Sequence, residues 1–477
     1  MGFALAPLLA GHAVAQQPLS AIEWLNDPAA QQADLPEGYR LHDDIADSGA
    51  VETIEITELG GNTATGVGML PLHVAGLPAT VWSGADPDDI ERRLAGLPLG
   101  LLPTANDILD RLLLAQAPSS DEILLIRLNR LFDAAKINHA FHLMQQQPIT
   151  NPELFRSFFD VALLADQDGV ACNQWSKNKA LSDDPAINIY CRAILGDWDT
   201  AVMNYFTLST LGDLRPIDDD LLRGFLDPEL VDELNLPTAY LQLITPLEFR
   251  LRDSIGWPVP TTGLSAPFAY ADLQPIAGWH AQLVAAERLA IIGSIPPATF
   301  KEIYTARVPA ASGGVWDRVA AFQVTMAAAQ TQNTAQLDKI LGPLWAASKQ
   351  AGLAPIMAKI LAPVLKGQAL NGSAAVAQRE ISMLTLPDDA ALQAAILDLP
   401  QAQRAAVADA FARPMPIVPP AGGITASDVL TALAHSDNVN EGNTARLPDM
   451  ITSLRAMGME SDARAMVVEY MLLVHTP

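Results

Sequence analysis

The sequence predicts a mostly α-helical protein: an α-solenoid of helical hairpins, preceded by a small irregular or β-containing N-terminal region. Apolar residues recur at helical spacing from residue 107 onward. A turn-like segment returns at intervals of about 30 residues, the length of a helix pair. Hydrophobic residues make up 50% of the 477 residues, so the chain can bury a sizeable core.

Residues 1–15 (MGFALAPLLAGHAVA) are apolar and small, and Ala13-Val14-Ala15 stands directly before Gln16. This is the pattern of a secretory signal peptide with its cleavage site. We therefore expect an exported protein, periplasmic or secreted, of the Gram-negative cell envelope. No Lys or Arg precedes the apolar run, so a buried helix is the alternative.

Residues 16–106 differ in composition from the rest of the chain. VETIEITEL at 51–59 alternates in the manner of a strand, and the following residues 60–78 are rich in Gly, Thr and Pro. We expect some β structure in this region.

Residues 107–255 are expected to form helical hairpin repeats. The first helix carries its apolar face in NDILDRLLLAQ, where Asn106 is a suitable N-cap. EILLIRLNRLF at 122–132 and ELFRSFFDVALLA at 153–165 continue the helical spacing, with a short polar break between them.

A near-repeat joins these helices. The segments 135–140, 165–170 and 196–201 each run from a small residue through a polar turn to Ala or Val. Asn138, Asp168 and Asp199 stand where the next helix needs an N-cap, whose side chain would accept from the free amides of its first turn. Small residues two positions later would let the paired helices approach closely. Residues 458–463 offer a fourth copy.

This pattern resembles tetratricopeptide-like helical hairpins over residues 107–212, with a further match at 446–474. The repeats run nearer 31 than 34 residues, and the Trp, Tyr and Pro marks of that family are not at regular positions. The resemblance therefore implies hairpins stacked in an α-solenoid, which present an extended binding surface.

The second half of the chain divides at Pro- and Gly-rich breaks. We expect a Pro-rich crossing at 256–275, a second helical region at 276–414, a linker at 415–427 and C-terminal helices at 428–477.

A broader resemblance covers the chain to about residue 330. The order LPATVWSG, ELFRSFFDVALL, IYCRAILGDWDTAV, PLEFRLRDSIG and PAASGGVWDRVAAFQ is similar to an uncharacterised group of exported helical proteins from alphaproteobacteria. That resemblance implies export but no reaction, cofactor or catalytic residue.

Net charge, apolar runs and cysteine content limit the classes of partner and the cell compartment that we expect. The chain has 29 Lys plus Arg against 54 Asp plus Glu, a net charge of -25, which disfavours nucleic acid. No apolar run long enough for a transmembrane segment follows the first residues. The two cysteines, Cys172 and Cys191, favour a structural disulfide in an oxidising compartment, and two buried thiols are the alternative.

The residues that carry chemistry form no catalytic or cofactor signature, and we expect neither a cofactor nor a metal. His139 and His142 stand three apart, but no third ligand accompanies them. Trp198 and Trp316 are candidate groove aromatics, with anchoring of one helix on its neighbour as the alternative.

These observations predict an exported, non-catalytic helical-repeat scaffold or adaptor that binds a protein or peptide partner. Its groove would be lined by the first helix of each pair. The alternatives are a subunit or enzyme of peptidoglycan or polysaccharide metabolism and a purely structural envelope component. The oligomeric state and the binding face stay open.

Overall fold

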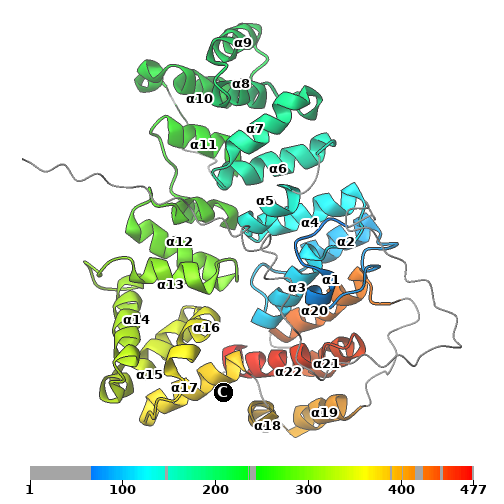
Figure 1. The fold of residues 1–477 in the computed structure, drawn as a ribbon, viewed down its shortest axis with the longest axis vertical. Coiled ribbons are helices and arrows are strands. Elements are labelled where there is room, and N and C mark those ends of the chain that lie inside the picture. Colours follow the sequence, from blue (N-terminus) through cyan, green and yellow to red (C-terminus); the bar gives the residue numbers. More distant parts are fainter. Residues whose placement is uncertain are drawn as a thin grey trace, which may run out of the picture. The chain divides into compact units, whose positions relative to one another are not determined.

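The described part of the protein is built from helices, as Figure 1 shows. The computed structural model describes residues 66–474, except 146–148, 235, 237–242, 387–388, 400, 414–422 and 441–443. These residues belong to one of the two units into which the chain divides, Asn62–Pro477. The expected signal peptide and the expected strand at 51–59 lie outside the described residues. The mostly α-helical fold predicted from the sequence is confirmed.

The described part of the N-terminal region forms helices rather than a sheet. It contains α1 (Leu72–Ala75), α2 (Pro87–Ala95) and the start of α3 (Pro103–Leu114). Its β structure is limited to two isolated bridges, Val67 to Ala117 and Leu70 to Ala115. Asn106 is not an N-cap, because Pro103 occupies the first turn and Asn106 lies inside α3.

The hairpins of the first half follow one another along the chain. They are α4 (Asp121–Asp133), α5 (Ile137–Gln145), α6 (Pro152–Leu164), α7 (Asp168–Lys177), α8 (Pro185–Ile194), α9 (Trp198–Leu211), α10 (Pro216–Leu226) and α11 (Pro246–Ser254), with the 3₁₀ helices η2 (Lys179–Leu181) after α7 and η3 (Pro228–Glu233) after α10. Helices α6 and α8 begin with a side-chain cap followed by Pro: Asn151 accepts from the Glu153 amide and Asp184 from the Ala186 amide. Each cap satisfies one otherwise free amide.

The turns inside the hairpins are built differently, around one residue with positive φ. These residues are Ala135, Asp166 and Gly196. In each turn the next amide bonds to the carbonyl five residues earlier, as Lys136 does with Leu131 at 2.8 Å. This is the Schellman arrangement, which satisfies the last carbonyls of the first helix.

The positive-φ residues correct the sequence alignment of the second repeat by one position. Counting five residues on from each, the structure places Ala140, Ala171 and Ala201 in equivalent positions, so Ala171 replaces Val170. All three alanines are fully buried. A small buried residue therefore lies at the expected position of the first and third repeats, whereas the position expected in the second, Val170, was wrong by one residue.

The second helical region has a hydrophobic core of its own. The crossing at 256–275 contains the 3₁₀ helices η5 (Thr261–Gly263) and η6 (Ala266–Leu273). The helices that follow are α12 (Trp279–Ile291), α13 (Pro297–Thr305), α14 (Val315–Gln330), α15 (Thr334–Gln350), α16 (Ala354–Leu365) and α17 (Gly372–Thr385). Their buried residues form one cluster, which Ala135 of the α4–α5 turn also joins.

The C-terminal helices return to the start of the described chain. They are α18 (Asp389–Asp398), α19 (Gln401–Ala412), α20 (Ala426–Asn440), α21 (Leu447–Ala456) and α22 (Glu460–Glu469), with η7 (Thr444–Arg446) before α21 and the π-helical turn η8 (Tyr470–Val474) at the end. Helices α20 and α22 pack against α3, and their apolar residues share the core of the first hairpins. Arg111 and Asp462 pair across this junction at 2.6 Å. Most of the expected linker at 415–427 lies outside the described residues.

A buried arginine ties the first helices together. Arg127 on α4 is fully buried and donates to the carbonyls of Leu113, Ala115 and Val67 at 2.7–3.1 Å. Burial lowers the pKa of Arg127 to about 10, so it keeps its charge at neutral pH. The guanidinium thereby holds the α3–α4 connection and the bridged segment before α1 in place.

Candidate functional site

The best candidate for a binding site is a cleft between α7, η2, α8 and α9, called here the α7–α9 cleft. Its volume is about 380 Å³. Its walls combine apolar, amide, hydroxyl and charged side chains: Trp175, Lys179, Asp183, Pro185, Asn188, Ile189, Arg192, Asn204, Thr207 and Leu208. The mixture of an apolar floor with a few polar groups is typical of ligand sites.

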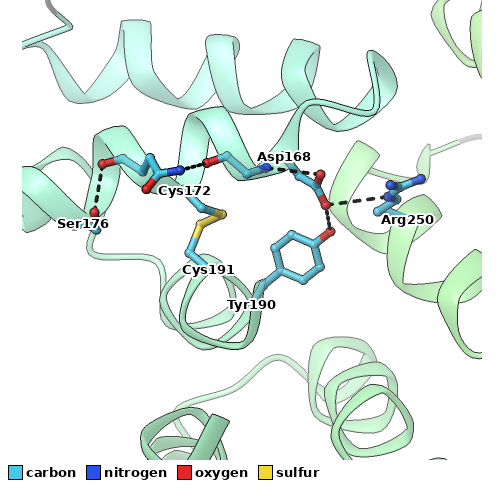
Figure 2. Close-up of a disulfide and its surroundings, with 8 residues drawn as sticks. Asp168, Cys172, Ser176, Tyr190, Cys191 and Arg250 are labelled. Atoms are coloured by element: carbon cyan, nitrogen blue, oxygen red, sulfur yellow. Dashed lines mark hydrogen bonds and ion pairs between the residues drawn. A yellow bond between two sulfur atoms is a disulfide. The ribbon is translucent and has the colours of Figure 1, made fainter. Parts of the chain in front are cut away.

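A disulfide fixes two walls of the cleft to each other. Cys172 on α7 and Cys191 on α8 are both buried and bonded, with a Cα–Cα distance of 5.0 Å (Figure 2). The disulfide predicted from the sequence is present. Trp175 lies one turn after Cys172, and Arg192 directly follows Cys191. The covalent link therefore also fixes where Trp175 lies relative to Arg192.

A polar network holds the start of α7 against α8 and α11. The hydroxyl of Tyr190 donates to the Asp168 carboxylate at 2.6 Å. Arg250 of α11 pairs with Asp166, and its Nε lies 3.9 Å from Asp168 (Figure 2). Burial raises the pKa of Tyr190, and the neighbouring Asp168 carboxylate raises it further. Tyr190 is therefore a stable hydrogen-bond donor, and α7 is held at its N-terminus as well as at its centre.

Two cations lie over the floor of the cleft. The Nζ of Lys179 is 5.8 Å, and the Cζ of Arg192 is 5.7 Å, from the centre of the Trp175 indole. Arg192 also donates to Asp197 at 2.8 Å. Lys179 is exposed and makes no ion pair within the described residues. The cleft therefore offers one uncommitted cation beside an aromatic ring.

Three polar atoms around the cleft lack hydrogen-bond partners in the part of the chain that the structure describes. They are Trp175 Nε1, Asn188 Oδ1 and Arg192 Nε, all buried. An unsatisfied buried donor or acceptor costs about 1–3 kcal/mol. A small adjustment on ligand binding could bring such atoms into hydrogen bonds. Their gathering at one cleft distinguishes it from the others.

Two other clefts are less suited to a ligand. One at the α12–α13 turn, beside Asp107 and Lys359, measures only about 80 Å³. A larger one of about 430 Å³ lies between α2 and α4, but its polar lining is dominated by Asp86, Asp88, Glu91 and Glu122. These like charges disfavour an anionic partner. None of the buried polar atoms without a partner in the described chain belongs to a residue that lines this second cleft.

The predicted cap residues lie inside the helices rather than directly before them, although Asp168 accepts from the first-turn amide of Gly169 at 3.2 Å. Asp168 is the first residue of α7, and Asn138 and Asp199 are the second residues of α5 and α9. The capping position was wrong because each second helix begins one or two residues earlier than expected, directly after its Schellman turn. The carboxylates of Asp168 and Asp199 still interact favourably with the positive end of the helix dipole, because both lie in a first turn.

The two predicted aromatics have different environments. Trp198 at the start of α9 is 42% exposed and lies 5.9 Å from the ring of Phe225 on α10. Trp316 on α14 is partly buried. The centre of its ring lies 5.2 Å from that of Trp279 and 5.4 Å from that of His280. Both pack one helix on its neighbour, and neither lines the α7–α9 cleft.

The histidine pair does not sit in a group of ligands. His142 Nδ1 lies 2.7 Å from the carbonyl of Asn138 in its own helix, and burial lowers the pKa of His139. Within the described residues, no cluster of three or more His, Cys, Asp or Glu side chains could hold a metal.

Sequence reasoning missed Trp175, Lys179 and Arg192, because they come from three separate elements. The groove also differs from the expected one, since it involves α7 and α9 as well as the first helix α8. One signal was available: both Trp175 and Arg192 lie within a turn of a disulfide cysteine.

None of the described helices is both long and apolar enough to cross a membrane. No family model, curated protein or solved structure matches the chain.

Proposed function

We propose that the protein is an exported, non-catalytic helical-repeat scaffold or adaptor that binds an extended segment of a partner protein in the α7–α9 cleft. The observation that carries this proposal is the cleft itself, where Lys179 and Arg192 lie over Trp175 in a chain of net charge -25. Cations are scarce in this sequence, so their placement together over an aromatic floor favours a binding role.

The chemistry of the cleft indicates the kind of segment it accepts. Lys179 offers charge-assisted hydrogen bonds to a carboxylate. Leu208, which is partly exposed, offers contact to an apolar side chain, and Asn204 and Thr207 can bond to peptide groups. The preferred segment therefore carries an acidic residue next to an apolar one.

Export to the cell envelope is supported by the disulfide. Structural disulfides persist in oxidising compartments such as the bacterial periplasm. The bond between Cys172 and Cys191 joins the two helices that frame the cleft. The disulfide therefore supports a partner that the protein meets in the envelope or outside the cell.

A peptide array tests this function. We expect the purified protein to select peptides that combine an acidic and an apolar residue. Lys179→Glu should weaken the selected peptides about tenfold, and raising the salt concentration should weaken them as well. Thr207→Arg places a bulky side chain on the opposite wall and should abolish selection.

Lys301→Glu provides the matched control, because Lys301 on α13 is exposed and lies outside the cleft. Its binding should equal that of the unmodified protein. Peptide binding that is unchanged in both Lys179→Glu and Thr207→Arg would contradict the proposed site. Release of soluble fragments from peptidoglycan by the purified protein would contradict the non-catalytic role.

A further inference from the structure

The outer face of α9 carries apolar side chains that nothing in the described chain covers. Met203 is 69% exposed, Phe206 63% and Leu211 67%. The opposite face of the helix is buried through Ala201 and Tyr205. The main neighbours of α9 are α8 and α10, and Figure 1 shows both on one side of it. Among the described helices, no later hairpin continues the stack at α9.

The outer face has the spacing of a helix-pairing seam. Asp199, Met203, Phe206 and Thr210 follow one another at intervals of four, three and four residues, and all four are exposed. At helical periodicity these residues form one stripe, as the seam positions of a coiled coil do. Its two central members are the large apolar ones. The stripe therefore fits the side of another helix.

We propose that this stripe pairs with the same stripe of a second copy of the chain, with the two α9 helices antiparallel. The four–three–four spacing is identical in either direction along the helix. A twofold axis near Asn204 and Tyr205 would thus place Met203 of one copy against Phe206 of the other. Such self-complementarity is what a twofold interface requires.

Charge decides between the antiparallel and parallel arrangements. In a parallel pair, Asp199 would face its own copy, and so would Asp213 just after the helix. In the antiparallel pair, Asp199 faces Thr210 and Asp213 faces Gly196. No acidic residue then meets another, which matters in a chain of net charge -25.

The exposed area sets the strength of the pair. Met203, Phe206 and Thr210 of the stripe offer roughly 350 Å² per copy, judged from the usual size of these side chains. The two copies together would bury about 700 Å², which is below the roughly 1,000 Å² of a stable specific interface. The dimer is therefore weak and reversible. It strengthens as salt rises, because salt screens the repulsion between two acidic chains.

This dimer is independent of peptide binding in the α7–α9 cleft. Met203 and Phe206 are not among the residues that line the cleft. Salt should act in opposite directions on the two interactions, so the failure of one leaves the other testable.

Sedimentation velocity over a concentration series tests the pairing. We expect the full chain to shift from monomer to dimer as its concentration rises, and more readily in high salt. Phe206→Glu should raise the dissociation constant at least about tenfold. Ile276→Glu makes the same change at a residue 93% exposed elsewhere and should leave it unchanged.

Cross-linking tests the direction of the helices. Both natural cysteines are in the disulfide, so a substituted cysteine is the free thiol of its chain. A mixture of the Met203→Cys chain and the Phe206→Cys chain, each with its own tag, should give mainly mixed dimers on mild oxidation. Dimers of Met203→Cys with itself would overturn the antiparallel arrangement. A monomer at every concentration and salt would overturn the dimer.

Discussion

The carboxylate of Glu469, at the end of α22, accepts hydrogen bonds from both the amide and the hydroxyl of Thr104 in α3. The two residues are 365 positions apart, and the hydroxyl contact measures 2.7 Å. Both are buried. This contact joins the last described α-helix to one of the first, so the hairpins between them are held at both ends.

The Thr104–Glu469 contact makes stability depend on pH. Burial raises the pKa of Glu469 from 4.5 to about 7, although the bonds from Thr104 oppose the shift. The unfolded chain therefore loses its proton at lower pH than the folded one. The contribution of Glu469 to the free energy of unfolding is therefore complete below pH 4.5 and is lost as pH rises through 7.

Glu469→Gln should remove this dependence. The amide keeps an acceptor for Thr104 and carries no charge, so the variant should be more stable than the unmodified protein at pH 8, by at most about 3 kcal/mol. At pH 4.5 the two should be nearly equal. Urea unfolding at both values measures the difference, with Glu302→Gln at an exposed position as control. A difference that is the same at both pH values would refute the assignment.

Arg127 should be among the least replaceable residues. Arg127→Met leaves the carbonyls of Leu113, Ala115 and Val67 without their donor, which should lower the free energy of unfolding by about 3–5 kcal/mol. Arg127→Lys should also destabilise, since an ammonium cannot reproduce the planar set of donors. Chemical denaturation measures both. Arg413→Met, at an exposed site, should change little, and equal effects at the two sites would contradict this role.

The positive-φ turns predict opposite effects of glycine at two positions. Gln332 has a φ of 53° and an exposed side chain, so Gln332→Gly should relieve strain and stabilise by about 0.5–1 kcal/mol. Gly458 has a φ of 77° with open space around it, so Gly458→Ala tests strain alone. It should destabilise by about 1 kcal/mol. Thermal melts of the two variants that shift in the same direction would contradict the turn geometry.

The sequence allowed the helices, the hairpin turns and the disulfide to be predicted, because each depends on residues close along the chain. Helical spacing reports directly on the buried face. The capping prediction failed because Ala135 and Asp166 adopt positive φ, a conformation that favours glycine and that their sequence does not announce.

Contacts between distant segments could not be predicted in the same way. Nothing local in the sequence brings Thr104 to Glu469, and the α7–α9 cleft depends on how α9 packs on α8. Trp175 and Arg192 become neighbours only through tertiary packing and the disulfide beside them.

The disulfide should stabilise the cleft as well as the fold. Cys172 and Cys191 are 19 residues apart, and closing a loop of this length contributes about 3 kcal/mol in the chain-entropy description. Replacing both by alanine should lower the midpoint of unfolding and weaken the peptides selected by the array. Calorimetry with the selected peptides, in the presence and absence of reductant, measures the change in affinity. Unchanged affinity after reduction would show that the cleft does not need the bond.

Hydrogen exchange with an array-selected peptide tests the central claim most directly. Amides on both sides of the cleft, in α7, α8 and α9, should exchange more slowly when the peptide is bound. Those of α14 and α15, which are far along the chain, should be unaffected. Protection confined to other helices, or no protection between residues 175 and 208, would contradict the α7–α9 cleft as the binding site.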